Sequence, residues 1–376
     1  MTLVRRGSGP GDVLGPRVLN RATLARQHLL ERTTRPVPDV VEHLVGLQAQ
    51  APFPPYFGLW SRIDGFMPDD LARRLVDRSL VRIVVMRGTI HLVTAADCAL
   101  LRPWVQPVFD RWLTADKDRA AGLDGLDLAE VAATGRALLA ERPMTSKELG
   151  PALRKVFPAA PAGSLEFAIR NRVPVVQIPP RAVWGKAGRP TWALAEEWIG
   201  RPLHSEPPAE EIVWRYLAAY GPATVADVQT WCGLTRLGEV VDRLLPRLRV
   251  FRSEDGSTLY DVPDAPRPDP ETPAPVRFLA EFDNVLLSYA DRTRIISDEA
   301  RKRVFTVNGL VRGTITVDGT VAGIWKTETN KRGSAVLVVE PFSRLRDRDV
   351  DALTAEGARL LSFAEPDATH DIRFVS

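Results

Sequence analysis

The order of the predicted elements repeats along the chain, and this repetition constrains the fold more than any other feature. The first pass has apolar residues at helical spacing over residues 20–30, 40–45 and 69–80, followed by strand-like segments at 81–85 and 89–93. Three helices followed by a β-hairpin is the plan of a winged helix-turn-helix. Two further passes show the same order. The sequence therefore predicts three tandem winged helices rather than one large helical domain.

Capping and turn residues locate the second and third passes. Thr145 and Glu148 have the spacing of a capping box that opens a helix. Thr224, after Gly221-Pro222-Ala223, occupies the equivalent point of the third pass. Asp255-Gly256 is a strong turn sequence between the two strands of the third hairpin. These local sequences support the repeat independently of the hydrophobic pattern.

The chain changes character after the third pass. Residues 263–275 contain six prolines in thirteen residues, which is typical of a linker. Beyond them, strand-like segments meet at Asn308-Gly309 and at Asp318-Gly319, and a helical pattern covers about 349–363. This indicates a β-meander or small β-barrel packed by one helix. The predicted fold class is α+β, with a flexible tail at 1–17, winged helices at 18–120, 121–205 and 206–263, a linker at 264–275 and the β-domain at 276–376.

Composition excludes several classes of protein. No run approaches the ~18 apolar residues of a membrane span, and residues 1–16 lack an apolar signal core, so we expect a cytoplasmic protein with no membrane partner. Cys98 and Cys232 lie far apart with no CxxC or Cys/His cluster nearby, so we expect buried free thiols and no metal. We find no P-loop or dinucleotide motif and expect no cofactor. The net charge of +3 and the pI of about 9.0 favour an anionic partner, and we expect a monomer.

Two glutamines stand where the second helical run ends. Gln48-Ala49-Gln50 is followed by Pro52, Pro54 and Pro55, and we expect these prolines to force an extended, irregular path. In an extended segment residues i and i+2 share a face, which places the two carboxamides side by side with Ala49 turned away. The alternative is two surface glutamines in a loop.

Three segments carry a resemblance to a known family. They are Gly46 to Gln50 with Pro52, Gly58-Leu59-Trp60 and Arg62; residues 87–93; and residues 282–294. Together, in this order, they resemble the winged-helix DNA glycosylases of the AlkZ type. The resemblance implies a monofunctional DNA glycosylase that hydrolyses the N-glycosidic bond of N7-alkylated guanine in duplex DNA, including bulky antibiotic-derived adducts. Some members carry Asp at the second glutamine position, and its absence here argues against the cross-link-specialised subgroup.

A glutamine pair suits the chemistry that this resemblance implies. A carboxamide cannot act as a general base, but an N7-alkylated purine is already cationic and leaves without being protonated. The enzyme then needs mainly to hold a water against C1′ and to stabilise the positive charge that develops on the sugar. We therefore predict that Gln48 and Gln50 are the catalytic, water-positioning pair.

Other residues of the three segments are candidates for support and for DNA contact. Asp283 and His91 are candidates for catalytic support, although a capping aspartate and a structural histidine fit the same positions. For phosphate contacts we predict the arginines of the segments, because a guanidinium binds phosphate through two hydrogen bonds. They are Arg62, Arg87, Arg292 and Arg294. Solvated helix faces would explain clustered arginines equally well.

Two other functions fit parts of the sequence. A non-enzymatic winged-helix transcriptional regulator would show the same repeats, and its C-terminal β-domain would sense a ligand or partner. Gln48-Ala49-Gln50 in its proline-rich setting is the feature that such a regulator would not require. A helical scaffold protein is the third possibility, and the clustered arginines argue against it.

Overall fold

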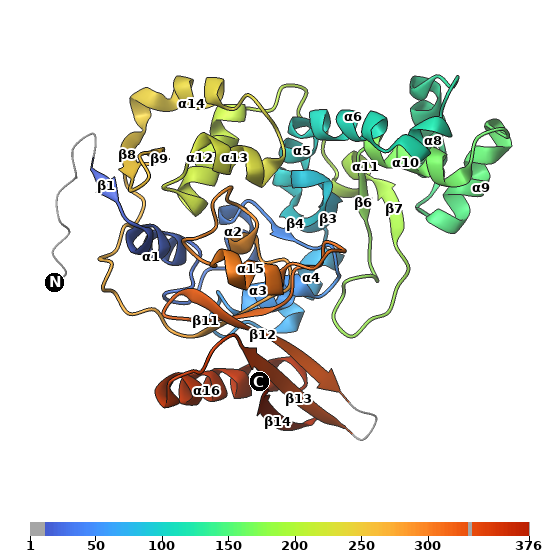
Figure 1. Ribbon diagram of the computed structural model, residues 1–376. Helices are drawn as coiled ribbons and strands as arrows, with labels where there is room; N and C mark the ends of the chain where they lie inside the picture. The colour runs from blue at the N-terminus through green and yellow to red at the C-terminus, as the bar shows by residue number, and fades with distance from the viewer. Residues whose placement is uncertain (1–11, 330–332, 376) are drawn as a thin grey trace.

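Three open sheets organise the chain in the computed structural model, which describes residues 12–329 and 333–375 (Figure 1). The strands are β1 (Val13–Leu14), β2 (Leu47–Gln48), β3 (Leu80–Val84), β4 (Ile90–Thr94), β5 (Met144–Thr145), β6 (Val175–Gln177), β7 (Thr191–Leu194), β8 (Arg249–Ser253), β9 (Thr258–Asp261), β10 (Arg277–Leu279), β11 (Thr314–Val317), β12 (Thr320–Thr329), β13 (Ser334–Pro341) and β14 (Thr369–Phe374). The α-helices are α1 (Pro16–Arg26), α2 (Val37–His43), α3 (Pro54–Trp60), α4 (Pro68–Val76), α5 (Ala95–Trp104), α6 (Gln106–Ala115), α7 (Lys117–Ala121), α8 (Leu128–Glu141), α9 (Ser146–Val156), α10 (Ala162–Arg172), α11 (Ala195–Ile199), α12 (Ala209–Tyr220), α13 (Val225–Cys232), α14 (Gly238–Leu244), α15 (Asp298–Val304) and α16 (Asp347–Ala364). Short 3-10 turns are η1 (Met86–Gly88), η2 (Leu245–Arg247) and η3 (Asn284–Leu286).

The central sheet joins the hairpins of the first two predicted winged helices. Its strand order is β2-β4-β3-β6-β7-β5, and β3 pairs antiparallel with both β4 and β6. All five residues of β3 are buried, which means that both faces of the sheet are covered at this strand. The first and second predicted units therefore share one sheet, and β2, which carries Gln48, lies at one end of it.

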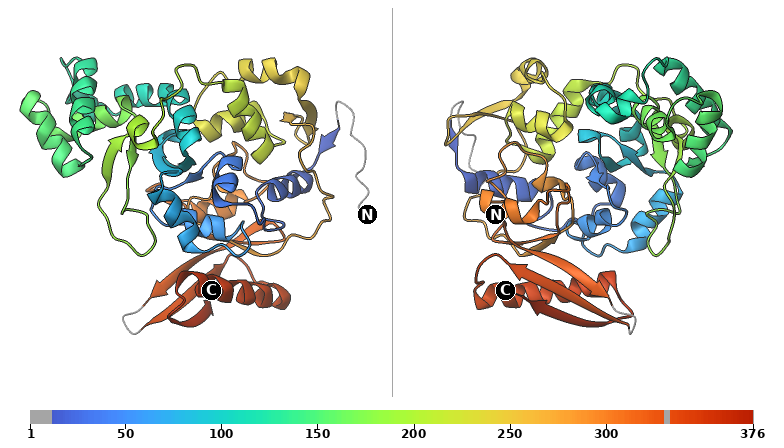
Figure 2. Two further views of the ribbon diagram at one scale, coloured as in Figure 1. Left: turned by 180° about the vertical axis from the view of Figure 1, so that it is seen from behind. Right: turned by 45° about the vertical axis from the view of Figure 1, so that its right-hand side comes forward.

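The apolar cores divide the molecule differently from the predicted repeat. One large cluster of buried side chains draws residues from α2 to α6, from α12 to α14 and from the C-terminal sheet. A separate cluster is formed almost wholly by residues from α7 to β7, and we call this part (residues 117–194) the outlying unit. Its helices α8, α9 and α10 stand at one side of the molecule in Figures 1 and 2. The outlying unit thus has its own core, although its strands extend the central sheet.

The C-terminal strands form an open sheet with the order β10-β11-β12-β13-β14. Neighbours from β10 to β13 pair antiparallel in chain order, whereas β14 pairs parallel with β13 after the crossover helix α16. No closed barrel is present within the described residues, so the barrel alternative is wrong. The turn at Asp318-Gly319 has the positive φ angles (47° and 81°) of the hairpin turn that the sequence predicts.

The segment before that turn differs from the prediction. Around Asn308-Gly309 only one bridge forms, between Phe305 and Val311, and no hairpin. Val307 is fully exposed there. Val311 is buried in the core and Phe305 packs against it, whereas Val307 and Leu310 are exposed, so packing covers only part of this segment and does not support two paired strands.

Proline misled the prediction at one further place. Residues 54–60 form α3 rather than an irregular path, with Pro54 and Pro55 in its first turn. Proline is tolerated there because the first N–H groups of a helix have no partner in the helix. Only residues 44–53, which include both glutamines, lie outside the helices on either side.

The predicted tail and linker are both tied to the body. Residues 1–11 lie outside the described residues, but Val13 and Leu14 pair with β8, and α1 begins at Pro16. Leu14 is buried with Phe251 and Leu259, which explains why this part of the predicted tail is held against the body of the protein. In the linker, Thr272 accepts a 2.7 Å hydrogen bond through its carbonyl from Nε of the buried Arg21.

Two further sequence expectations can be compared with the structure. Cys98 and Cys232 are buried free cysteines, which confirms that prediction. The capping box at Thr145 and the helix cap at Thr224 are also confirmed. Among residues 12–329 and 333–375, none of the helices has the length and apolar character needed to cross a membrane.

Candidate active site

Gln48 is held at the end of the central sheet by partners from three parts of the chain. Its strand β2 pairs antiparallel with β4, so that Gln48 stands opposite His91. The side chain is buried, and its Oε1 accepts a 2.8 Å hydrogen bond from Nη2 of Arg87. Its backbone N–H donates to Oδ1 of Asn284 over 3.3 Å. Arg87 therefore fixes the side-chain amide of Gln48, and Asn284 fixes its backbone N–H.

Gln50 lies just beyond the strand and is exposed. Its Oε1 accepts a 3.1 Å hydrogen bond from the backbone N–H of Ile90 on β4. Ala49 between the glutamines is fully buried, and its carbonyl accepts a 2.8 Å hydrogen bond from Nη2 of the buried Arg82 on β3. The Gln50 side chain thus reaches β4, the Gln48 side chain reaches Arg87 in the η1 turn before β4, and Ala49 is anchored from β3.

The partners of the two amides also determine which way each amide faces. Arg87 and the Ile90 N–H are both donors, so an oxygen rather than an NH2 group must face each of them. A carboxamide oxygen has two lone pairs, and each of these oxygens uses one in the hydrogen bond described above. Each therefore keeps one acceptor position for a water proton. One of the two amides is buried and preorganised, while the other opens to solvent.

Arg87 is a positioning residue in this arrangement. It lies in η1, where its own φ is +55°, and its guanidinium also donates to the carbonyl of Trp231 on α13. Burial lowers the pKa of Arg87 to about 10, so the group stays charged at neutral pH. Its donors are directed to groups inside the protein. We predicted Arg87 as a phosphate contact, whereas this conformation uses its guanidinium to hold Gln48.

His91 lies next to Arg87 and contacts its guanidinium. It is fully buried, and burial, followed by the nearby charge of Arg87, lowers its pKa to about 3. Nδ1 lies 3.0 Å from the Thr89 carbonyl oxygen and Nε2 lies 3.4 Å from Nη2 of Arg87. A neutral ring with its proton on Nδ1 satisfies both contacts, because it donates to Thr89 and accepts from Arg87. A neutral ring with no solvent contact fits a positioning role better than proton transfer.

Asp283 and Arg62 form a buried ion pair behind the site. Nη1 and Nη2 of Arg62 each lie 2.8 Å from one carboxylate oxygen of Asp283, and both side chains are shielded from solvent. Asp283 also accepts a 3.0 Å hydrogen bond from the Val285 N–H at the start of η3. Arg62, which the sequence suggested for DNA contact, has no surface left for a phosphate in this structure. Hydropathy gave no sign of this pairing, because the partners are 221 residues apart.

Asn284 is a site residue that the sequence analysis did not single out. Besides accepting from the Gln48 N–H, it donates through Nδ2 to the Gly46 carbonyl over 2.9 Å. It thereby holds the backbone on both sides of Leu47. Its place inside the third family segment, directly after Asp283, was the one available indication.

The two remaining predicted arginines differ in exposure. Arg294 is buried, donates to the Pro222 carbonyl over 2.8 Å and stacks over Tyr289, so it too is a structural residue. Arg292 is half-exposed and stacks over Phe305, with its Nε donating to the Tyr289 carbonyl. It has no acidic partner in the part of the chain that the structure describes. Of the four predicted arginines, Arg292 alone is placed to meet an external anion.

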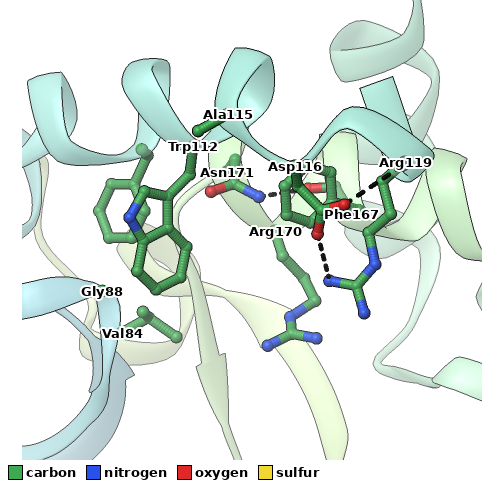
Figure 3. Close-up of a pocket in the computed structure, with 10 residues that line it drawn as sticks. Val84, Gly88, Trp112, Ala115, Asp116, Arg119, Phe167, Arg170 and Asn171 are labelled. Carbon is green, nitrogen blue, oxygen red and sulfur yellow. Dashed lines mark hydrogen bonds and ion pairs between the residues drawn. The ribbon is translucent and has the colours of Figure 1, made fainter. Parts of the chain in front are cut away.

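A cavity of about 400 Å³ opens on the other side of η1. Figure 3 shows the indole of Trp112 over Gly88 and the guanidinium groups of Arg119 and Arg170 on the same side as the ring of Phe167. A Cβ on Gly88 would lie 2.5 Å from the Trp112 ring, so this close contact requires glycine. Arg119 is paired with Asp116, whereas Arg170 has no acidic partner among the described residues. The sequence analysis did not find this basic, aromatic surface.

In the segments 12–329 and 333–375, no three His, Cys, Asp or Glu side chains lie close enough together to hold a metal ion. The site is instead composed of amides, buried arginines and a neutral imidazole.

Comparison with known proteins identifies the class to which this fold and site belong. A family model described as DNA glycosylase AlkZ-like matches residues 41–363, which include all three segments of the predicted resemblance. The chain belongs to this family of AlkZ-like DNA glycosylases, and the resemblance stated from the sequence is confirmed.

One particular relative appears in both the sequence and the structure comparisons. The interstrand DNA cross-link repair glycosylase of Streptomyces sahachiroi is 25% identical over 364 residues, which cover 90% of this chain and 93% of the relative. The structure of the Streptomyces sahachiroi DNA glycosylase AlkZ matches with a TM-score of 0.79 at 22% identity, over 96% of this chain and all of that one. The α+β fold of this chain is thus shared with AlkZ along nearly its whole length.

Proposed function

We propose that this protein hydrolyses the N-glycosidic bond of N7-alkylated guanine in duplex DNA, as a monofunctional glycosylase that uses Gln48 and Gln50 to position the attacking water. One observation carries the proposal. The Gln48 oxygen is oriented by the guanidinium of Arg87 and the Gln50 oxygen by the backbone N–H of Ile90 on β4, and each keeps a free lone pair. This is an arrangement that can hold the protons of one water molecule.

The chemistry needs no general base stronger than an amide. An N7-alkylated guanine carries a positive charge and departs as a neutral base, so the sugar develops positive charge as the C1′–N9 bond breaks. The water then adds to C1′ and loses its proton to solvent. Two convergent amide dipoles stabilise the cationic sugar because they are already oriented before the reaction begins. Gln48 supplies the rigid half of the pair and Gln50 the solvent-facing half.

Residues around the pair keep its geometry. Arg87 orients Gln48, His91 accepts from Arg87, and Asn284 holds the backbone at Gln48. Asp283 acts through the ion pair with Arg62, which stabilises the loop that carries Asn284. We assign these residues to positioning and none of them to proton transfer.

Double-stranded DNA is the proposed partner, bound largely without regard to sequence. Arg292 and Arg170, the two arginines described above that lack an acidic partner, are the proposed phosphate contacts. We propose a cytoplasmic monomer that requires no metal or cofactor. The name of the relative includes interstrand cross-link repair, so cross-linked guanine belongs among the proposed substrates. This weighs against the inference drawn from the missing Asp at position 50.

The test uses a duplex with a single N7-methylguanine and scores abasic sites under single-turnover conditions. Gln48→Ala and Gln50→Ala should each slow excision about 100-fold, as expected for the loss of one preorganised polar contact of ~3 kcal/mol. DNA affinity should hardly change, because phosphate contacts are made elsewhere. A protein that binds this duplex and never releases the base would instead support the alternative of a transcriptional regulator.

Two further variants test whether the glutamines act together. Gln48→Ala/Gln50→Ala should be little slower than the slower single variant, because two residues that hold one water act as a unit. Gln50→Asp keeps an acceptor at the solvent-facing position and should retain activity with an altered pH profile. Wild-type excision rates in both alanine variants and in the double variant would end the assignment.

A further inference from the structure

A small cavity begins at the residue that follows Gln50. It measures about 280 Å³ and is lined by Ala51, Phe53, Phe57, Glu281, Trp325 and Lys326, among others. This is below the ~300–1,000 Å³ of pockets that hold drug-sized ligands, so the cavity suits a group of about nucleobase size. Ala51 directly follows Gln50 in the chain, so the cavity begins one residue away from the exposed half of the proposed water site.

The aromatic walls of the cavity are fixed in place. Trp325 donates through Nε1 to the Leu279 carbonyl over 2.8 Å, and its ring lies 5.6 Å from that of Phe57. Gly313 allows this position, since a Cβ there would lie 2.9 Å from the indole. Phe53 is 37% exposed and contributes a face that a ligand can reach. Rigid aromatic faces favour a flat ligand, because little side-chain freedom is lost on stacking.

The charge in the cavity is negative. Glu281 has no hydrogen-bond or ion-pair partner among residues 12–329 and 333–375. Lys326 also lines the cavity, but its Nζ lies 2.6 Å from Oε1 of Glu328, which neutralises it. The surrounding protein partly buries Glu281 and thereby raises the pKa of its carboxyl group. An unpaired carboxylate beside aromatic rings is a combination that favours a flat organic cation.

The backbone holds Glu281 apart from the buried acid two residues later. Phe282 between them has a φ of +57°, and its N–H donates to the Val311 carbonyl over 3.2 Å. Asp283 is used by Arg62 in the interior, whereas Glu281 lines the cavity. Two positions of one loop, separated by a single residue, thus provide a structural carboxylate and a free one.

We propose that this cavity binds the positively charged purine ring of the alkylated nucleotide, with Glu281 countering its charge and Phe53 stacking on its face. The proposal rests on the proposed function, since it names the part of the substrate that lies next to Gln50. A normal guanine is neutral and lacks the ionic attraction to the carboxylate. The cavity therefore selects the damaged base by charge as well as by shape.

The test compares binding of two duplexes that differ in one charge. One carries N7-methylguanine on a 2′-fluoro sugar, which slows base loss so that binding can be measured. The other carries 7-methyl-7-deazaguanine on the same sugar, which has nearly the same shape and no charge. Wild-type protein should bind the cationic duplex about fivefold more tightly, as expected for one partly screened ion pair. Glu281→Gln should remove this preference, and Glu281→Asp should keep most of it.

Two control variants separate charge from folding and stacking. Glu130→Gln, at an exposed site on α8, makes the same change in net charge and should keep the full preference. Phe53→Ala should weaken binding of both duplexes equally, because stacking does not depend on the base carrying a charge. If Glu281→Gln keeps the preference, or if wild-type protein shows none, the proposal is wrong. It also fails if wild-type protein does not excise N7-methylguanine, and that result, unlike the others, overturns the proposed function as well.

Discussion

The glutamine site and the outlying unit are built in opposite ways. Gln48 accepts a hydrogen bond from a residue 39 positions away and donates one to a residue 236 positions away, and the Arg62–Asp283 ion pair spans 221 positions. The core of the outlying unit is formed by residues between 113 and 194. The site is thus a product of the whole chain, whereas the outlying unit is largely a product of its own segment. A destabilising substitution at the glutamine site should therefore affect the whole protein, whereas one in the outlying unit should have a local effect.

The largest expected effect comes from breaking the central ion pair. Asp283→Ala leaves Arg62 charged, fully buried and unpaired, which should lower the free energy of unfolding by about 3–5 kcal/mol. Urea denaturation followed by tryptophan fluorescence measures this. Glu239→Ala removes the partner of Arg236 from a pair that is exposed to solvent, and should change stability little. Similar small losses in both variants would show that the site does not depend on the buried pair.

A cavity placed in either core tests whether the two regions are independent. Leu153→Ala in the outlying unit and Leu217→Ala in the large core both truncate fully buried leucines and should each cost about 2–5 kcal/mol. Hydrogen exchange should speed up only in α7 to α10 for Leu153→Ala, with excision nearly unchanged. Leu217→Ala should destabilise the site as well. Equal exchange across the protein in both variants would mean that the shared sheet couples the two cores.

Arg87 offers a smaller and more local change. Arg87→Met keeps an apolar side chain of similar length but removes the donor that orients Gln48. The loss of a hydrogen bond from a charged group, ~1.5–3 kcal/mol, predicts about a 10- to 100-fold slower excision. In Gln48→Ala the same change should have much less effect, because its target is gone. Additive losses in the double variant would show that Arg87 acts on the reaction independently of Gln48.

His91 predicts a pH dependence of stability. Its pKa is about 3 in the folded protein and ~6.5 in an unfolded chain, so the unfolded state binds the proton first as pH falls. His91 therefore favours folding least at low pH, and should contribute a loss of up to ~1.4 kcal/mol per pH unit below about pH 6.5. Unfolding measured at pH 7 and pH 5 should show a smaller decrease in His91→Asn than in wild type. The same decrease in both would mean that the ring is protonated inside the fold.

The smallest expected effect concerns the surface. Arg292→Ala should reduce the slope of log affinity against log salt concentration by about 0.9, the value for one phosphate contact on duplex DNA. Arg348→Ala, on the exposed first turn of α16, serves as the matched control and should leave the slope unchanged. Fluorescence anisotropy at several salt concentrations gives both values. An unchanged slope in Arg292→Ala would remove this residue from the DNA contact.

Features with local causes could be predicted from the sequence. The capping boxes at Thr145 and Thr224 and the turn at Asp318-Gly319 depend on the side chains of a few consecutive residues. The positions of β3 and β4 also follow from local apolar residues, although the polar Arg82, His91 and Thr94 in these strands are buried as well. The failure at α3 is also local, since proline in a first turn and proline in a loop give similar sequences.

The roles of the arginines could not be predicted, because each depends on a partner far away in the chain. By itself, the sequence determined an α+β chain of the AlkZ-like family with a Gln-Ala-Gln motif after its second helix. Only the tertiary structure decided that Arg62 forms an ion pair with Asp283 and that Arg87 donates a hydrogen bond to Gln48. It also decided that Arg292 and Glu281 have no charged partner within the described residues. The physical reason is that the free energy of a charged group depends on its burial and on the opposite charges around it, and folding brings these together from distant segments.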